Sequence, residues 1–190
     1  MRWCALLAAL ALEACVPSGT GVAPLAVVTL PPNPAIAGIA IAADQSLTVV
    51  ATLPSLSIFT NIQRTAGQLD RLSGPAPLTV FAATDNAFAG LAPGVPANLL
   101  APENRPVLTR LAAYHLVSGR IDTAELRRQI AASGTATLTT LAGDVLTVTT
   151  DGPALVLTDA NENRCYIEVA DVRLTNGVLH TINGVLIPAL

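Results

Sequence analysis

At 190 residues the chain is long enough for one domain of common size together with a targeting segment and a linker. Hydrophobic residues make up 52% of the chain and charged residues 12%, which excludes a charge-rich disordered protein. The net charge is −3, and the ten basic residues are all arginines with no cluster beyond Arg127 and Arg128, so we expect no nucleic-acid binding.

The amino terminus has the pattern of an export signal. Residues Trp3 to Leu12 are apolar, too few to span a bilayer and of the length of a signal-peptide core. Leu12, Glu13, Ala14 and Cys15 then resemble a bacterial lipoprotein processing site. We therefore predict a signal peptide over residues 1–15 and lipidation of Cys15, the alternative being a plain secretory signal that is cut elsewhere.

This prediction fixes the expected location of the protein. With a lipidated Cys15 it is an exported outer-membrane or cell-surface lipoprotein, which touches the membrane through its lipid anchor only. Without lipidation it is periplasmic or secreted.

Residues 16–42 are predicted to form a proline-rich tether. Five prolines and two glycines lie between Val16 and Pro34, a composition that suits an extended linker. The alternative is an edge strand over Leu25 to Leu30. The folded domain is then expected over residues 43–190.

Two helical segments are predicted at the start of this domain. Ser46 can cap a short helix that runs through Ala51. Pro54 can begin a second helix, which ends before Gly67. One face of this helix comprises Leu56, Phe59, Ile62 and Gln63.

The next element is a strand that leads directly into a helix. Leu78 to Ala83 is a short apolar run bounded upstream by glycine and proline, as in buried strands. Thr84 or Asp85 can then accept hydrogen bonds from the free N–H groups of a helix that begins beside it.

Two or three more helical segments follow. One turn is expected near residues 98–101, and Pro106 suits the first turn of a helix that ends at Gly119. Asp122 or Thr123 can cap a further helix, which is closed by Gly134.

From Thr135 to Leu190 the sequence changes to residues typical of strands. Thr, Val, Leu and Ile alternate with polar turn pairs such as Asp151-Gly152 and Asn176-Gly177, a spacing that predicts an antiparallel meander. Helices followed by hairpins, with one strand supplied from before the helices, indicate an α+β domain.

Two stretches of this domain resemble the signatures of the fasciclin domain family. Residues 79–88, T-V-F-A-A-T-D-N-A-F, are similar to the first signature, T-V-F-A-P-T-D-x-A-F, with Ala83 where the family commonly has proline. Residues 176–188, N-G-V-L-H-T-I-N-G-V-L-I-P, resemble the second. The matching signature positions include Thr79, Phe81, Thr84, Asp85, Phe88, Asn176, Gly177, His180, Asn183 and Pro188.

The resemblance implies a wedge of mainly antiparallel strands flanked by several short helices. It implies an adhesion module with a protein, matrix or polysaccharide partner, and neither a catalytic centre nor a cofactor. Tyr114 and His115 fall where the family often has a Tyr-His pair, which in animal members is linked to integrin recognition. The residues themselves favour another interpretation, since His115 shares a helical face with apolar side chains and so is expected to be buried and hydrogen-bonded.

The second histidine is predicted to be structural. His180 alternates with Val178 and Ile182 on one side of a strand, which places it towards the core. Because the resemblance sets the two signature strands side by side, we expect His180 to hydrogen-bond Thr84 or Asp85.

Candidate catalytic and metal-binding patterns are weak. Neither histidine lies near a G-x-S-x-G motif. Asp159, Asn161 and Asn163 resemble the start of a calcium loop, but the sixth position is not glycine, so a polar hairpin loop is favoured. Cys165 alternates with apolar residues and is expected to face the core. The sequence therefore predicts no enzyme and no metal site.

Two main functions remain as hypotheses, beside a weaker third, a domain that mainly assists envelope assembly through protein partners. The first is an exported, non-enzymatic module for contact with cells, matrix or envelope components. The second is a carrier that holds a small apolar ligand, such as a lipid or carotenoid, in a groove between the helices and the sheet.

Overall fold

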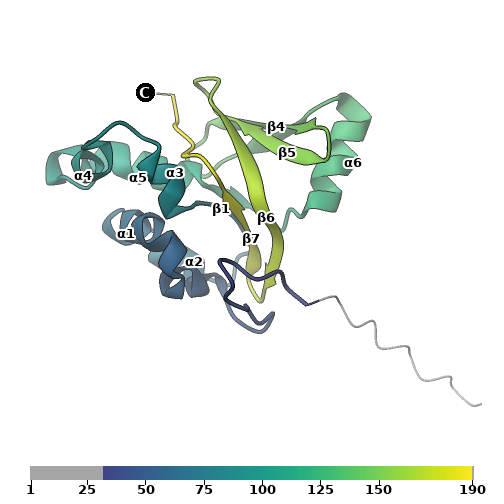
Figure 1. The fold of residues 1–190 in the computed structure, drawn as a ribbon, viewed down its shortest axis with the longest axis horizontal. Coiled ribbons are helices and arrows are strands. Elements are labelled where there is room, and N and C mark those ends of the chain that lie inside the picture. Colours follow the sequence, from purple (N-terminus) through teal and green to yellow (C-terminus); the bar gives the residue numbers. More distant parts are fainter. Residues whose placement is uncertain (1–31, 190) are drawn as a thin grey trace, which may run out of the picture. The chain divides into compact units, whose positions relative to one another are not determined.

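The computed structural model describes residues 32–189 (Figure 1). The predicted signal peptide, Cys15, the possible strand over residues 25–30 and most of the tether lie outside these residues. Among the described helices, none combines the length and the apolar composition needed to cross a bilayer.

A seven-stranded sheet forms the centre of the domain. Its spatial order is β2-β1-β7-β6-β5-β4-β3. The strands are β1 (Leu78–Ala83), β2 (Leu116–Ser118), β3 (Ala136–Thr139), β4 (Val145–Asp151), β5 (Ala154–Thr158), β6 (Arg164–Leu174) and β7 (Gly177–Ile182).

The helices are short, and most of them precede β3. Figure 1 shows α1 to α5 on one side of β1 and β7, with α6 on the other side near β4 and β5. The α-helices are α1 (Ser57–Thr65), α2 (Leu69–Ser73), α3 (Asp85–Ala89), α4 (Val95–Leu99), α5 (Arg105–Tyr114) and α6 (Thr123–Ser133). The 3₁₀ turns are η1 (Leu47–Thr52), η2 (Pro54–Leu56) and η3 (Pro102–Asn104).

Strand pairing confirms the predicted α+β class. The strands β3 to β7 form the expected antiparallel meander. The exception is the parallel pair of β1 and β7, in which Leu78 lies opposite Gly177 and Ala83 opposite Ile182. The two signatures therefore lie side by side, as the resemblance implied.

The two ends of the sheet approach each other. Val117 of β2 forms an antiparallel bridge with Thr140, which follows β3. The Leu141 N–H group donates to the Leu116 carbonyl oxygen at 2.8 Å. These contacts join β2 to the segment that follows β3.

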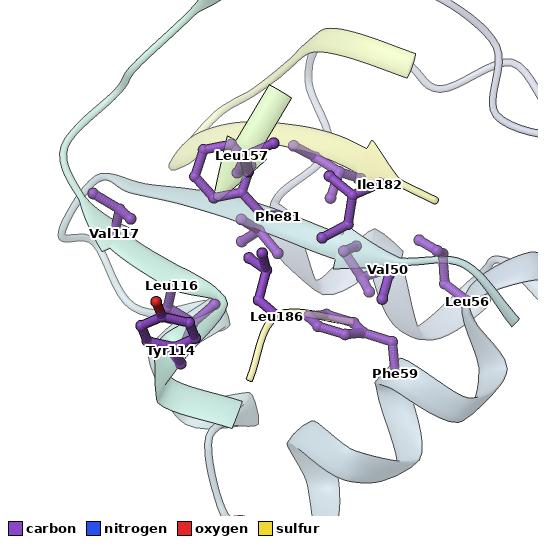
Figure 2. Packing of buried hydrophobic residues seen from close by; sticks show 14 of the residues in the cluster. Val50, Leu56, Phe59, Phe81, Tyr114, Leu116, Val117, Leu157, Ile182 and Leu186 are labelled. Carbon is purple, nitrogen blue, oxygen red and sulfur yellow. The ribbon is translucent and has the colours of Figure 1, made fainter. Parts of the chain in front are cut away.

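One hydrophobic core joins the sheet to the helices. Phe81 of β1, Phe59 of α1, Tyr114 of α5 and Leu186 near the carboxyl end are buried and lie close together in Figure 2. Leu157 and Ile182 add side chains from β5 and β7 to the same cluster. The low aromatic content leaves most of the core to Leu, Val, Ile and Ala.

Several helix boundaries differ from the sequence predictions. The helix predicted to end at Gly119 stops at Tyr114, because Leu116–Ser118 pairs with β1 as the strand β2. The helix α2 was not predicted. The segment after Ser46 is 3₁₀ and not α-helical, and the Ser46 hydroxyl bonds Thr48 in place of capping the backbone.

Residues at the end of the expected tether pack against the domain. Ile36 and Ile41 are buried in the hydrophobic core. The Asn33 side chain pairs with the backbone of Arg173 in β6, donating to its carbonyl oxygen at 2.7 Å and accepting from its N–H group at 2.8 Å. The packed region therefore extends upstream of residue 43.

Gly177 permits the close approach of β7 to β1 and η1. A Cβ atom on Gly177 would lie 2.1 Å from the Leu78 carbonyl oxygen and 2.7 Å from Leu47 Cδ1. The first contact is with backbone, so it cannot be relieved by a side-chain rotation. The second signature therefore requires glycine at this position.

We predict that Gly177→Ala destabilises the domain by about 3 kcal/mol or more, because the parallel pair must move apart. Gly90→Ala is the matched control, since Gly90 has ordinary helical geometry and its added Cβ would meet only Ala87 O at 3.4 Å. Urea unfolding should show a change within about 0.5 kcal/mol for the control. Equal stability of the two variants would contradict this role of Gly177.

Candidate functional site

The first signature forms the turn between β1 and α3. The Thr84 hydroxyl accepts a hydrogen bond from the Ala87 N–H group at 3.3 Å, which makes Thr84 the helix cap. The Asp85 carboxylate bonds another helix, accepting from Ser57 Oγ at 2.6 Å and from the Ile58 N–H group at 2.9 Å. Asp85 therefore joins α3 to the free N–H groups at the start of α1.

Thr79 and Phe81 fix the strand itself. The Thr79 hydroxyl donates to the Gly119 carbonyl oxygen at 2.8 Å and accepts from the Ile121 N–H group at 2.9 Å. Phe81 is buried and stacks on the His180 ring, with ring centroids 5.3 Å apart. Phe88 of α3 is buried in the same core.

His180 is in the core, but its predicted partner was wrong. Its Nδ1 atom accepts from the Asp171 N–H group at 3.2 Å, and its Nε2 atom lies 2.9 Å from the Ile121 carbonyl oxygen. Both ring nitrogens are thus engaged by backbone groups, and neither Thr84 nor Asp85 is a partner. The cause is an irregularity in β6, where Asp171 has φ +59° and its N–H group turns towards β7.

Asn176 anchors the start of the second signature. Its side-chain oxygen accepts from the Leu47 N–H group at 2.8 Å, and its amide group donates to Leu72 O at 2.7 Å and to Gly74 O at 2.9 Å. One buried side chain therefore holds η1, the end of α2 and the β6–β7 turn together.

Tyr114 and His115 are both buried. The Tyr114 hydroxyl donates to Val145 O at 3.0 Å and accepts from the Ala160 N–H group at 3.1 Å. His115 lies edge-on to Phe59, with centroids 5.5 Å apart. Their burial argues against direct contact with a partner and gives His115 the structural place that its helical pattern predicted.

A polar cluster fastens the carboxyl-terminal segment. His115 Nε2 accepts from the Leu186 N–H group at 3.3 Å, and the Asp159 carboxylate accepts from the Ile187 N–H group at 2.9 Å. Asn161 donates to the carbonyl oxygens of Ile187 and Pro188 at 2.9 and 3.3 Å. The end of the second signature is therefore held by the β5–β6 loop.

The same loop explains the apparent calcium pattern. Asp159 accepts hydrogen bonds from the backbone N–H groups of Asn161 and Asn163 and from the Asn163 side chain. Its oxygens face N–H donors within the protein. Within residues 32–189 no group of three or more His, Cys, Asp or Glu side chains is placed to hold a metal ion.

Asn183 of the second signature directly follows β7 and continues the pairing of β6 and β7. Its side-chain oxygen accepts from the Tyr166 N–H group at 2.8 Å, and its own N–H group donates to Tyr166 O at 3.1 Å. Asn183 therefore acts as a further rung of the ladder without belonging to a strand.

The two histidines and Cys165 of the described domain have structural positions. Burial lowers the pKa of His115 to about 4, with a smaller opposing effect from its bond to Leu111. Burial also lowers the pKa of His180. Cys165 faces the core as predicted, and burial, followed by the nearby Asp159, raises its thiol pKa to about 11, so the nucleophilic thiolate is scarce at neutral pH.

Two hollows on the described surface have contrasting linings. The polar pocket encloses about 250 Å³ and is lined by Ser55, Thr84, Asp85, Asn86, Glu168 and Thr181, with Ile36, Ala37 and Val169. The apolar groove encloses about 160 Å³ and is lined by aliphatic side chains of α4, α5 and the carboxyl-terminal segment, among them Leu99, Val107 and Ile187. Sequence reasoning did not find the polar pocket, because its members come from five separate segments.

The protein is an α+β domain in which a strand from each of the two signatures pairs with the other in parallel and is buried. A model of the fasciclin domain matches residues 54–188, and the chain belongs to the fasciclin domain family. These domains are generally adhesion-type interaction modules and are commonly found in extracellular or secreted proteins.

Three relatives illustrate the breadth of the family. Protein sll1483 of Synechocystis sp. is 34% identical over 153 residues, which cover 78% of this chain and 78% of the relative. Uncharacterized protein sll1735 of Synechocystis sp. is 32% identical, over 64% of this chain and 81% of the relative. Transforming growth factor-beta-induced protein ig-h3 of Sus scrofa is 33% identical over 66% of this chain, but the match spans only 16% of that protein.

A solved structure agrees on the fold. The FAS1 domain pair of the insect cell adhesion molecule fasciclin I superposes with a TM-score of 0.66 and 19% sequence identity, covering 77% of this chain. The chain spans about half of that pair, 51% of its length. At this identity the likeness concerns the fold alone.

The hydrogen bonds predict opposite neutral tautomers for the two histidines. His115 Nε2 accepts from Leu186, so its proton is on Nδ1, whereas His180 Nδ1 accepts from Asp171, so its proton is on Nε2. Nitrogen-15 spectra of the imidazoles should show one ring of each kind. Two rings with the same tautomer would contradict these contacts.

The depressed pKa of His115 also makes stability depend on pH. Its contribution is fully present above about pH 6.5 and is lost as pH falls towards 4, because the unfolded chain binds a proton first. The shift corresponds to about 3 kcal/mol. Urea unfolding should show a smaller pH slope for His115→Gln than for the wild type, and an unchanged slope would contradict this assignment.

Proposed function

We propose that the protein is an exported, lipid-anchored interaction module that contacts other cells, matrix or envelope components. The observation that carries the proposal is the match of residues 54–188 to the fasciclin domain, a family of adhesion-type modules. Burial of Tyr114, His115 and His180 supports a non-catalytic role, because their polar atoms are already bonded within the protein.

The partner is a protein or a matrix polysaccharide. Contact falls on exposed surfaces of the domain, since the signature side chains Phe81, Phe88 and His180 are in the core. No nucleic acid is expected, given the net charge of −3.

The proposed anchor is a lipid on Cys15. Its support is the position of Leu12, Ala14 and Cys15 directly after the apolar run. The membrane is then touched through the lipid alone, and residues between Cys15 and the described domain serve as the tether. If the signal is cut elsewhere, the same module is periplasmic or secreted.

The apolar groove favours a second candidate function, a carrier of a small apolar ligand. Its lining side chains are aliphatic, and Val107 at its border is exposed. Its volume of about 160 Å³ is below the roughly 300 Å³ of a typical small-molecule site, so it suits the end of a lipid chain better than a whole carotenoid. Extractable lipid or visible absorbance in protein purified from its native host would favour the carrier.

For the interaction module, we predict that a host strain lacking this protein attaches less well to surfaces and that the full chain restores attachment. Unchanged attachment of the deletion strain on several surfaces would contradict the adhesive function.

For the anchor, Cys15→Ser should release the protein from the membrane fraction, and mass spectrometry of the wild-type amino terminus should find the lipid on Cys15. Cys165→Ser is the matched control, because Cys165 is buried in the domain and should not affect anchoring.

A further inference from the structure

The polar pocket lies where the two parallel signature strands end. Thr84 follows β1, and Thr181 is close to the end of β7. The irregular part of β6 adds Glu168, and η2 adds Ser55. Together with Asp85 and Asn86 of α3, these side chains surround a hollow of about 250 Å³.

The charge in this pocket has one sign. Asp85 and Glu168 are its ionisable lining residues, and no arginine lines it within the described part of the chain. Asp85 is held in place by Ser57 and Ile58, each of which occupies one of its oxygens and leaves further acceptor positions open. Glu168 is exposed and forms no ion pair among residues 32–189. A cation would meet two carboxylates from different elements.

An exposed amide side chain adds a further acceptor to the pocket. Ser55 also lines the hollow, but its Oγ atom has no exposed surface, so a ligand in the hollow does not reach that hydroxyl. The Asn86 side chain, which is exposed at the same pocket, is unbonded in the described chain and can accept a hydrogen bond.

We propose that the polar pocket binds an arginine side chain of a protein partner. A guanidinium presents five N–H donors, which can bond Glu168 in the bidentate manner and also reach Asp85 or Asn86. The hollow of about 250 Å³ is large enough for one such side chain and is below the size of usual cofactor sites. The inference rests on the proposed function and names the chemistry of the partner.

The test uses nitrogen-15 spectra of the full mature protein titrated with N-acetyl-arginine amide. The neutral probe N-acetyl-citrulline amide has the same shape and lacks the charge. We expect arginine to shift the amides near Ser55, Asn86 and Glu168, and citrulline to bind about three- to fivefold more weakly. Raising the salt from about 0.05 M to about 0.5 M should weaken arginine binding.

Two pocket variants and one control variant separate recognition from folding. Glu168→Gln should weaken arginine binding about three- to fivefold, and Glu103→Gln, an exposed carboxylate on η3, should leave it unchanged. Asn86→Ala should weaken binding without lowering stability, since the Asn86 side chain is exposed at the pocket and unbonded in the described chain. Equal binding of arginine and citrulline, shifts elsewhere on the surface, or full affinity in Glu168→Gln would overturn the proposal. The proposal would also be overturned if a neutral polysaccharide shifted the same amides and arginine did not.

Failure of this inference is distinguishable from failure of the proposed function. If attachment depends on the protein but arginine does not bind, the assignment of the pocket is wrong and the proposed interaction module is retained. If arginine binds at the pocket but deletion leaves attachment unchanged, the adhesive function is wrong and the assignment of the pocket is retained.

Discussion

The parallel pairing of β1 with β7 is the constraint on which the rest of the domain depends. It joins two segments that are far apart in the sequence, so its formation orders the helices α3 to α6 and the strands β2 to β6, which lie between them. Polar side chains secure both of its ends. Asn176 bonds η1 and the end of α2 at one end, while Thr84 and Asp85 fix the starts of α3 and α1 at the other. Gly177 allows the two strands to approach, because any larger residue would meet the Leu78 backbone.

This arrangement places the signature side chains Phe81, Phe88, Asn176 and His180 in the core. His115 and His180 would attract attention in a search for catalytic residues, yet their ring nitrogens bond backbone groups of Leu111, Leu186, Ile121 and Asp171. A buried, fully bonded histidine contributes to a unique fold and offers nothing to a partner. The same fold can therefore carry different surfaces, and function has to be argued from exposed or hollowed parts such as the polar pocket.

Local signals made much of this fold predictable. The strand over residues 78–83, the Thr84 cap and the helix between Asp122 and Gly134 each depend on a few adjacent residues, and all three are confirmed. The strand β2 was missed because its pairing with β1 is non-local, and the preceding helical pattern concealed its start. Alternation placed His180 in the core, but only the irregular backbone at Asp171 decides its partner. The polar pocket could not be predicted, since Ser55, Asp85 and Glu168 meet only after folding.

Native-state hydrogen exchange tests the central role of the parallel pair most directly. The account predicts that amides of β1 and β7, together with the Thr84 N–H group that bonds Ile182 O, exchange only when the whole domain unfolds. Amides of the short helix α4 should exchange at a lower free energy. The account would be contradicted if β1 and β7 opened at a lower free energy than β4 and β5, because the meander would then be stable without the signature strands.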